Sequence, residues 1–152
     1  GGFNYSKTIL VGHSLGGPII CRMAIDEPSK YKGLFIVAGS VSPELEPEDK
    51  YRYVLNSKLV RWMLPNTLDV SNQEILPAKQ ELLNMEPFWK NISCKVVIMQ
   101  GQDDNLVPPG NADYAEKMLV NASELKVIRL AEMNHFIPFT KPELMTDVLL
   151  SF

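Results

Sequence analysis

The sequence has few of the residues that cross-link small domains or bind structural metals. Its 152 residues include two cysteines and two histidines, too few for a disulfide framework or for a structural zinc site of the usual spacing. The formal net charge is −3, and no run of lysine and arginine is present. Because polyanion binding needs clustered positive charge, we expect no structural metal and no nucleic-acid partner.

Long apolar runs are also missing. Nothing approaches the ~20 apolar residues of a membrane span, and the opening Gly1-Gly2-Phe3 is neither an initiator Met nor a basic and then apolar signal sequence. Hydrophobic residues nevertheless make up 45% of the chain, and a chain of about 150 residues buries roughly 68–70% of its unfolded surface. We expect a folded cytoplasmic domain with no membrane span.

Four short runs of β-forming residues without polar alternation predict the strands of a parallel sheet buried on both faces. They are Thr8–Val11, Leu34–Val37, Val96–Met99 and Leu125–Leu130. The last run is more mixed, so we place it nearer an edge of the sheet. Helical patterns cover Pro18–Ile25, Asn111–Val120 and Pro142–Phe152. Such alternation of strand and helix is typical of an α/β domain with a mainly parallel sheet.

Residues 42–91 interrupt this alternation, and we interpret them as a helical insertion between two core segments, 1–41 and 92–152. One amphipathic segment carries apolar residues at helical spacing: Val54, Leu55, Leu59, Trp62 and Met63. A second helix is indicated by Ser71-Asn72-Gln73-Glu74, a pattern typical of a capping box. Pro77 either kinks this helix or marks its true start.

The segment Gly12-His13-Ser14-Leu15-Gly16 fits the pattern G-x-S-x-G, directly after a predicted strand and directly before a predicted helix. A serine at the tip of such a tight turn exposes its oxygen. The flanking Gly12 and Gly16 would let strand and helix approach without Cβ clashes. The N-terminus of the following helix adds partial positive charge beside a developing oxyanion. This strand–turn–helix setting predicts that Ser14 is a nucleophile.

A serine hydroxyl needs a base at neutral pH. His13 is adjacent to Ser14, and neighbours on a tight turn diverge, so we assign it to packing or to a pocket wall. His135 remains, just after the last strand and at the carboxyl end of the sheet. A carboxylate that fixes its tautomer would come from Asp103 or Asp104, after the third strand, and at most one of these adjacent side chains can serve.

Together these motifs resemble the α/β-hydrolase family, in its serine esterase and lipase branch. The order Ser14, Asp104, His135 is the order of that family's triad. Residues 101–108 match its acid-loop pattern G-x-x-D-x-x-V-P, and this match selects Asp104 over Asp103. The segment Asn134-His135-Phe136 is similar to the family's histidine turn before the last helix.

In that family the G-x-S-x-G turn, here residues 12–16, is called the nucleophile elbow, and the strand before it is the elbow strand. The resemblance implies the C-terminal portion of that fold, from the elbow strand onward, with four strands and a small helical cap at 42–91. It implies that Leu15 supplies one backbone N–H of the oxyanion hole, whereas the second donor comes from a segment before the elbow that this chain lacks. The elbow strand is central in the family. We therefore expect an exposed edge at Thr8–Val11 that associates with a second copy or with an N-terminal complement.

The predicted activity is hydrolysis of a small-molecule ester or thioester through an acyl-enzyme on Ser14, without a metal or organic cofactor. The substrate-pocket residues indicated are His13, Trp62 and Phe136, although aromatic residues at helical spacing are more often core. Two alternatives stay open. One is an acyltransferase that uses the same acyl-enzyme, and the other is an incomplete, non-catalytic fragment or assembly module.

Overall fold

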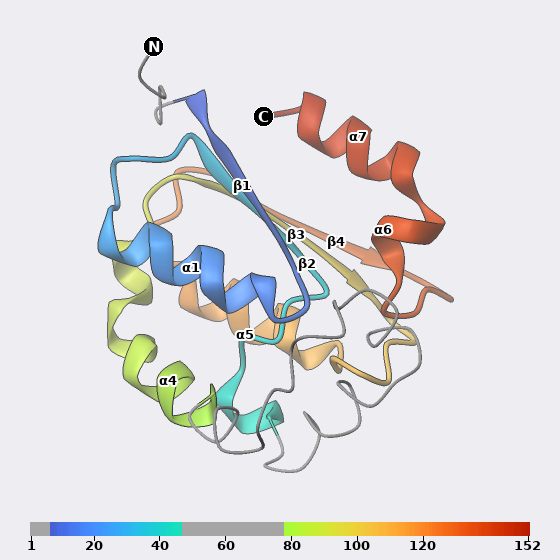
Figure 1. Ribbon diagram of the computed structural model, residues 1–152, viewed down its shortest axis with the longest axis horizontal. Helices are drawn as coiled ribbons and strands as arrows, with labels where there is room; N and C mark the ends of the chain where they lie inside the picture. Colours follow the sequence, from blue (N-terminus) through green and yellow to red (C-terminus); the bar gives the residue numbers. More distant parts are fainter. Residues whose placement is uncertain (1–6, 47–77) are drawn as a thin grey trace, which may run out of the picture.

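The structure is a computed structural model that describes residues 7–46 and 78–152. Its centre is a sheet of four parallel strands in the order β1-β2-β3-β4 (Figure 1). The strands are β1 (Ile9–His13), β2 (Gly33–Val37), β3 (Lys95–Gly101) and β4 (Leu125–Leu130). All four predicted strands and the α/β fold class are confirmed.

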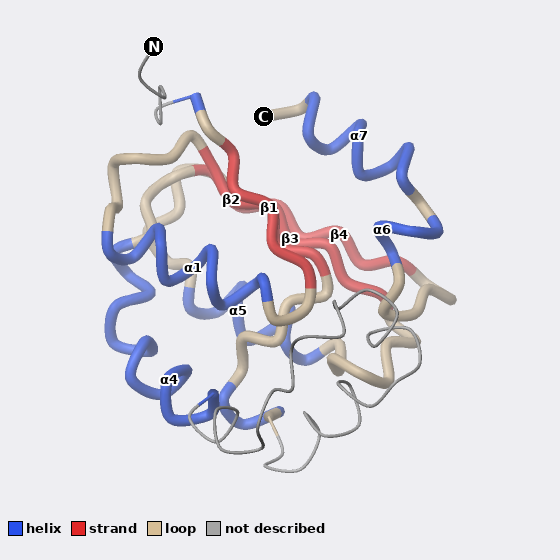
Figure 2. Tube along the Cα trace, viewed as in Figure 1, coloured by secondary structure: helices blue, strands red, loops and turns tan. Residues whose placement is uncertain are grey.

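Helices cover both faces of this sheet. The α-helices are α1 (Gly16–Asp26), α4 (Ala78–Met85), α5 (Gly110–Met118), α6 (Ile137–Thr140) and α7 (Pro142–Leu150). Two 3-10 helices, η2 (Pro43–Leu45) and η3 (Glu86–Asn91), accompany them. Figure 1 and Figure 2 show α1, α4 and α5 on one side of the sheet and α6 and α7 on the other. Within residues 7–46 and 78–152, no helix is long and apolar enough to cross a membrane.

The inner parts of the two central strands, Leu34–Val37 and Val96–Met99, are apolar and buried on both faces of the sheet. Side chains alternate along β2, so Leu34 and Ile36 join the core cluster under α1, whereas Phe35 and Val37 join the cluster under α7. This pattern explains why the β2 run shows no polar alternation in the sequence.

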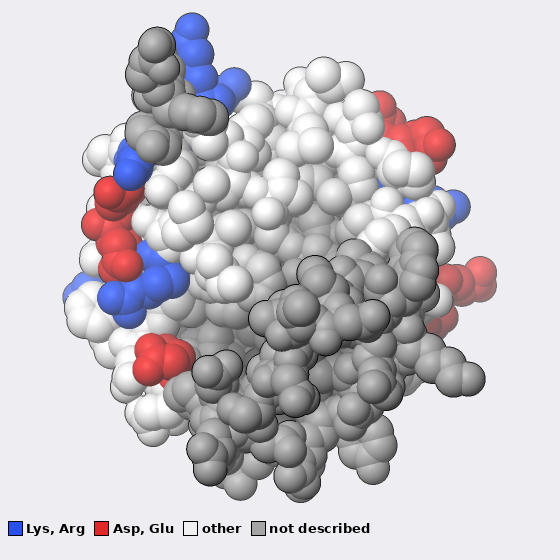
Figure 3. Space-filling view, in the orientation of Figure 1, with Lys and Arg blue, Asp and Glu red and all other residues white. Residues whose placement is uncertain are grey.

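The prediction of burial on both faces is wrong for β1 within the described residues. There β1 pairs with β2 alone and forms one edge of the sheet, and Val11 is 45% exposed. The surface over β1 is largely free of charged side chains (Figure 3). The prediction that Leu125–Leu130 lies near an edge is confirmed, since β4 forms the opposite edge.

Most of the predicted insertion, residues 47–77, lies outside the described residues, including the amphipathic segment around Trp62 and the capping box at 71–74. Its described parts are residues 42–46, which include η2, and the segment from α4 at Ala78 onward. Leu82, Met85 and Trp89 are buried in the same core cluster as α1. The division of the chain at residues 42 and 91 stays a prediction.

Candidate active site

The predicted catalytic residues all follow carboxyl ends of strands. Ser14 comes directly after β1, Asp104 after β3 and His135 after β4. Because the strands are parallel and in register, their carboxyl ends lie together at one end of the sheet. The fold therefore places three residues from distant parts of the sequence at this carboxyl end.

Ser14 occupies a backbone conformation that non-glycine residues seldom adopt, with φ of 57°. Its N–H donates to the Val37 carbonyl at 3.1 Å, and its carbonyl accepts from the N–H groups of Gly17 at 3.0 Å and Ser40 at 3.1 Å. Bonds to β2 and to the segment after it thus hold the turn in place. Strain held by surrounding structure in this way is typical of functional positions.

Two glycines of the turn are required by space. A Cβ on Gly12 would collide with the backbone carbonyl of Gly16, and a Cβ on Gly17 would lie 2.8 Å from the Cα of Gly39. A Cβ on Gly16 would meet nothing within 4 Å among the described residues. The role predicted for Gly16 is therefore wrong, and Gly17 provides the close approach of the helix instead.

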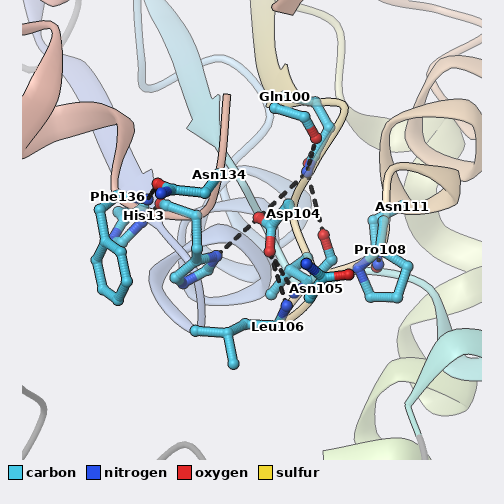
Figure 4. Close-up of polar contacts among 12 residues, drawn as sticks. His13, Gln100, Asp104, Asn105, Leu106, Pro108, Asn111, Asn134 and Phe136 are labelled. Carbon is cyan, nitrogen blue, oxygen red and sulfur yellow. Dashed lines mark hydrogen bonds and ion pairs between the residues drawn. The ribbon is translucent and has the colours of Figure 1, made fainter. Parts of the chain in front are cut away.

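Asp104 is 3% exposed and anchors the acid loop. Its Oδ1 atom accepts from the backbone N–H groups of Leu106 at 2.9 Å and Val107 at 2.8 Å (Figure 4). These bonds close a turn around the carboxylate. Its Oδ2 atom lies 2.8 Å from Nδ1 of His135. Asp103 is exposed, so Asp104 is the carboxylate that the structure brings to the histidine.

The contact with Asp104 sets the tautomer of His135, which is 4% exposed. A carboxylate oxygen accepts, so Nδ1 of His135 carries the hydrogen and Nε2 of the neutral ring can accept a proton. In the described part of the chain, no hydrogen bond joins the Ser14 hydroxyl to His135. Such bonds often tighten only when substrate is bound.

Gln100 belongs to this network and was missed in the sequence. It is 1% exposed, and its Nε2 donates to Oδ2 of Asp104 at 3.3 Å, with the carbonyls of Gly101 at 3.2 Å and Val107 at 3.1 Å also within reach. An amide nitrogen has two hydrogens to share among these acceptors. A polar residue directly after the apolar run Val96–Met99 was the available signal.

His13 and Phe136, two of the predicted pocket residues, both contact His135. Nε2 of His13 lies 2.9 Å from the His135 carbonyl oxygen, and the two ring centroids are 4.6 Å apart. The Phe136 ring meets the His135 ring edge-on, with centroids 5.6 Å apart. Trp62, the third predicted pocket residue, lies outside the described residues.

Comparison with known proteins identifies the architecture. The family model for the alpha/beta hydrolase fold matches residues 2–64. A monoacylglycerol lipase of Paleococcus ferrophilus superposes with a TM-score of 0.72 over 95% of this chain and 67% of its own, at 17% identity. This chain has the α/β-hydrolase fold. No curated protein matches its sequence significantly.

Other solved structures resemble this α/β-hydrolase-fold chain to a similar degree. A serine hydrolase of a Cycloclasticus bacterium has a TM-score of 0.71 at 13% identity, over 95% of this chain and 63% of its own. A carboxylesterase structure from the thaumarchaeon Nitrososphaera gargenis has a TM-score of 0.64 at 21% identity, over 98% of this chain and 65% of its own. The chain thus spans 63–67% of the length of these three structures.

A cavity of about 470 Å³ lies between α1 and α4 of the hydrolase fold. Its lining is mostly apolar: Leu15, Pro18, Ile19, Ala78, Leu82 and Met85, with Arg22 and Glu81. Leu15 is the predicted oxyanion donor, and it precedes α1 without a side-chain cap. The partial positive charge at the start of a helix favours an anion beside it. Among the described residues, no group of three or more His, Cys, Asp or Glu is placed to hold a metal ion.

Proposed function

We propose that the chain is a serine hydrolase that cleaves a carboxylic ester or thioester through an acyl-enzyme on Ser14. The observation that carries this proposal is the buried contact of 2.8 Å between Asp104 Oδ2 and His135 Nδ1. It lies at the carboxyl end of the sheet, where Ser14 occupies its strained turn. A carboxylate, an imidazole of the matching tautomer and a serine together form the constellation used in acyl transfer.

The proposed reaction has two halves. In the first, Ser14 Oγ attacks the acyl carbon while its proton passes to His135 Nε2, and Asp104 stabilises the imidazolium. The oxyanion of the tetrahedral intermediate accepts a hydrogen bond from the Leu15 N–H. The intermediate then collapses, breaking the bond to the leaving group, which takes the proton from His135. In the second half, water attacks the acyl-enzyme with His135 as base, and the acid and free Ser14 are released.

The names of the similar structures agree with an ester substrate, since they include a monoacylglycerol lipase and a carboxylesterase. A shared fold does not by itself determine the substrate. The apolar lining of the cavity at Leu15 supports an acyl group with aliphatic character.

The experiment is turnover of p-nitrophenyl esters from acetate to dodecanoate. We expect measurable hydrolysis by the chain, and a fall to the uncatalysed background in Ser14→Ala and in His135→Ala. Ser14→Ala removes the hydroxyl that attacks the acyl carbon, and His135→Ala removes the base that accepts its proton. Asp103→Asn is the matched control, since it removes an exposed carboxylate next to Asp104. Retention of turnover by Ser14→Ala would exclude Ser14 as the nucleophile.

We also propose that the edge formed by β1 is an association surface for a second copy or for an N-terminal complement. Three observations support it: β1 pairs with β2 alone in the described sheet, Val11 is 45% exposed, and the surface there carries little charge (Figure 3). Such an edge offers unpaired backbone groups to another strand. In sedimentation velocity we expect a concentration-dependent dimer, which Val11→Lys should weaken. A monomer at all concentrations would contradict self-association.

A further inference from the structure

His13 makes a contact that its position in the elbow motif does not explain. Its Nε2 atom lies 2.9 Å from the backbone carbonyl oxygen of His135, 122 residues further along the chain. The two rings are tilted by 40° with their centroids 4.6 Å apart, and the Phe139 ring meets His13 edge-on at 6.4 Å. The residue next to the nucleophile therefore contacts both the backbone and the ring of the predicted base.

The nature of each partner determines where the two histidines carry their hydrogens. A carbonyl oxygen only accepts, so Nε2 of His13 must carry a hydrogen and donate it. His135, by contrast, carries its hydrogen on Nδ1, which faces Oδ2 of Asp104 at 2.8 Å. The neutral forms of the two neighbouring rings are therefore opposite tautomers, and each tautomer is set by a different hydrogen bond.

The two rings also differ in how well they can hold a positive charge. Burial lowers the pKa of His13; the bond to the His135 carbonyl raises it, charge on His135 lowers it and charge on Asp104 raises it, which leaves it below 6.5. The titratable groups that act on His13 are thus His135 from the base loop and Asp104 from the acid loop. His13 is neutral at neutral pH, so no like charge opposes an imidazolium on His135.

We propose that His13 is a positioning residue for His135, a neutral donor that ties the base loop to the nucleophile elbow. This inference rests on the proposed function, in which His135 is the base. The hydrogen bond attaches the His135 backbone to the residue before Ser14. The Asp104–His135 pair is then held at a fixed position relative to the nucleophile, although β2 and β3 separate β1 from β4 in the sheet. Positioning of this kind contributes to rate because small displacements of a base are costly.

Two variants separate hydrogen bonding from packing. His13→Gln keeps a neutral N–H near the place of Nε2, whereas His13→Leu has similar bulk and no donor. We expect His13→Leu to lower kcat about tenfold with KM changed less than about twofold, and His13→Gln to recover most of that loss. A role in packing alone predicts the opposite order, since leucine fills a half-buried site better than glutamine. Phe139→Leu is the control, because it removes a ring contact and leaves the hydrogen bond.

Nitrogen-edited proton NMR of the whole chain tests the same inference without relying on turnover. We expect the His13 hydrogen on Nε2 at about pH 7 and a downfield Nδ1 proton on His135. That downfield signal should exchange faster in His13→Leu but persist in His13→Gln and Phe139→Leu. A His13 hydrogen on Nδ1, or a cationic His13 at about pH 7, in the unmodified chain would overturn the inference, whether or not the variants fold.

The two readouts distinguish failure of this inference from failure of the proposed function. If the chain lacks esterase activity but the His135 signal depends on His13 as described, the positioning role is supported and the proposed function is rejected. If the chain hydrolyses esters and His13→Leu keeps both its rate and its His135 signal, the proposed function stands and the positioning role is rejected.

Discussion

Replacing Asp104 by asparagine is expected to lower ester turnover about 10⁴-fold while the chain stays folded. The Asp104 carboxylate accepts four hydrogen bonds: from Leu106 and Val107 on Oδ1, and from Gln100 and His135 on Oδ2. Asparagine can keep the first two through its remaining oxygen. Its amide nitrogen then faces the two donors on the other side, where neither contact can form as it stands.

The consequence falls on His135. The ring can recover a bond to the new amide only by giving up the hydrogen on Nδ1 and accepting there. The neutral ring then carries its hydrogen on Nε2, where the Ser14 proton would have to go. The large loss of rate comes from this change of tautomer together with the loss of a negative charge beside the imidazolium.

The measurement is kcat on the best p-nitrophenyl ester, with thermal unfolding followed by circular dichroism. Asp103→Asn, which changes the exposed neighbour, should match the unsubstituted chain in both. A rate for Asp104→Asn within about tenfold of the original would show that Asp104 does not set the tautomer of a catalytic base.

The second large effect is expected at Gly12. Gly12→Ala should destabilise the chain by at least about 3 kcal/mol, at the upper end of overpacking costs, because the new methyl group meets the Gly16 carbonyl, which is backbone and cannot swing aside. Relief requires the end of β1 and the start of α1 to separate. That movement would also disturb the turn that holds Ser14.

Gly16→Ala in the same motif is the matched control. A Cβ at Gly16 meets nothing within 4 Å among the described residues, and no glycine in the described chain has a positive φ. Alanine at this first residue of α1 should be neutral or stabilise the chain by up to about 1 kcal/mol. Urea unfolding of both variants is the measurement. Equal stabilities would show that strand and helix do not approach as closely as the structure has them.

The sequence was most informative where local pattern and global fold agree. Uninterrupted apolar runs predicted β2 and β3 because both strands are buried on both faces. The acid loop was predicted through its pattern, and the structure adds the reason: the two N–H groups of Leu106 and Val107 turn back to the Asp104 side chain. His135 followed from there being two histidines and from its place after β4.

Features that depend on contacts between distant segments were not predictable in this way. The exposed edge at β1 was expected from the family resemblance alone, because an apolar run looks the same at a sheet edge as at its centre. In the sequence, Gln100 looks like an ordinary polar residue at the end of a strand. Its part in the site is visible only from its hydrogen bond to Asp104. Gly16 and Gly17 are indistinguishable as letters, and only the approach of Gly39 shows which one needs to lack a side chain.

The central claim is that Ser14 is a nucleophile activated by the Asp104–His135 pair. The most direct measurement is labelling of the chain with a fluorophosphonate, followed by mass spectrometry of its peptides. We expect one adduct, on Ser14, that is absent in Ser14→Ala and His135→Ala and retained in Asp103→Asn. An adduct on another residue, or equal labelling of His135→Ala, would contradict the account.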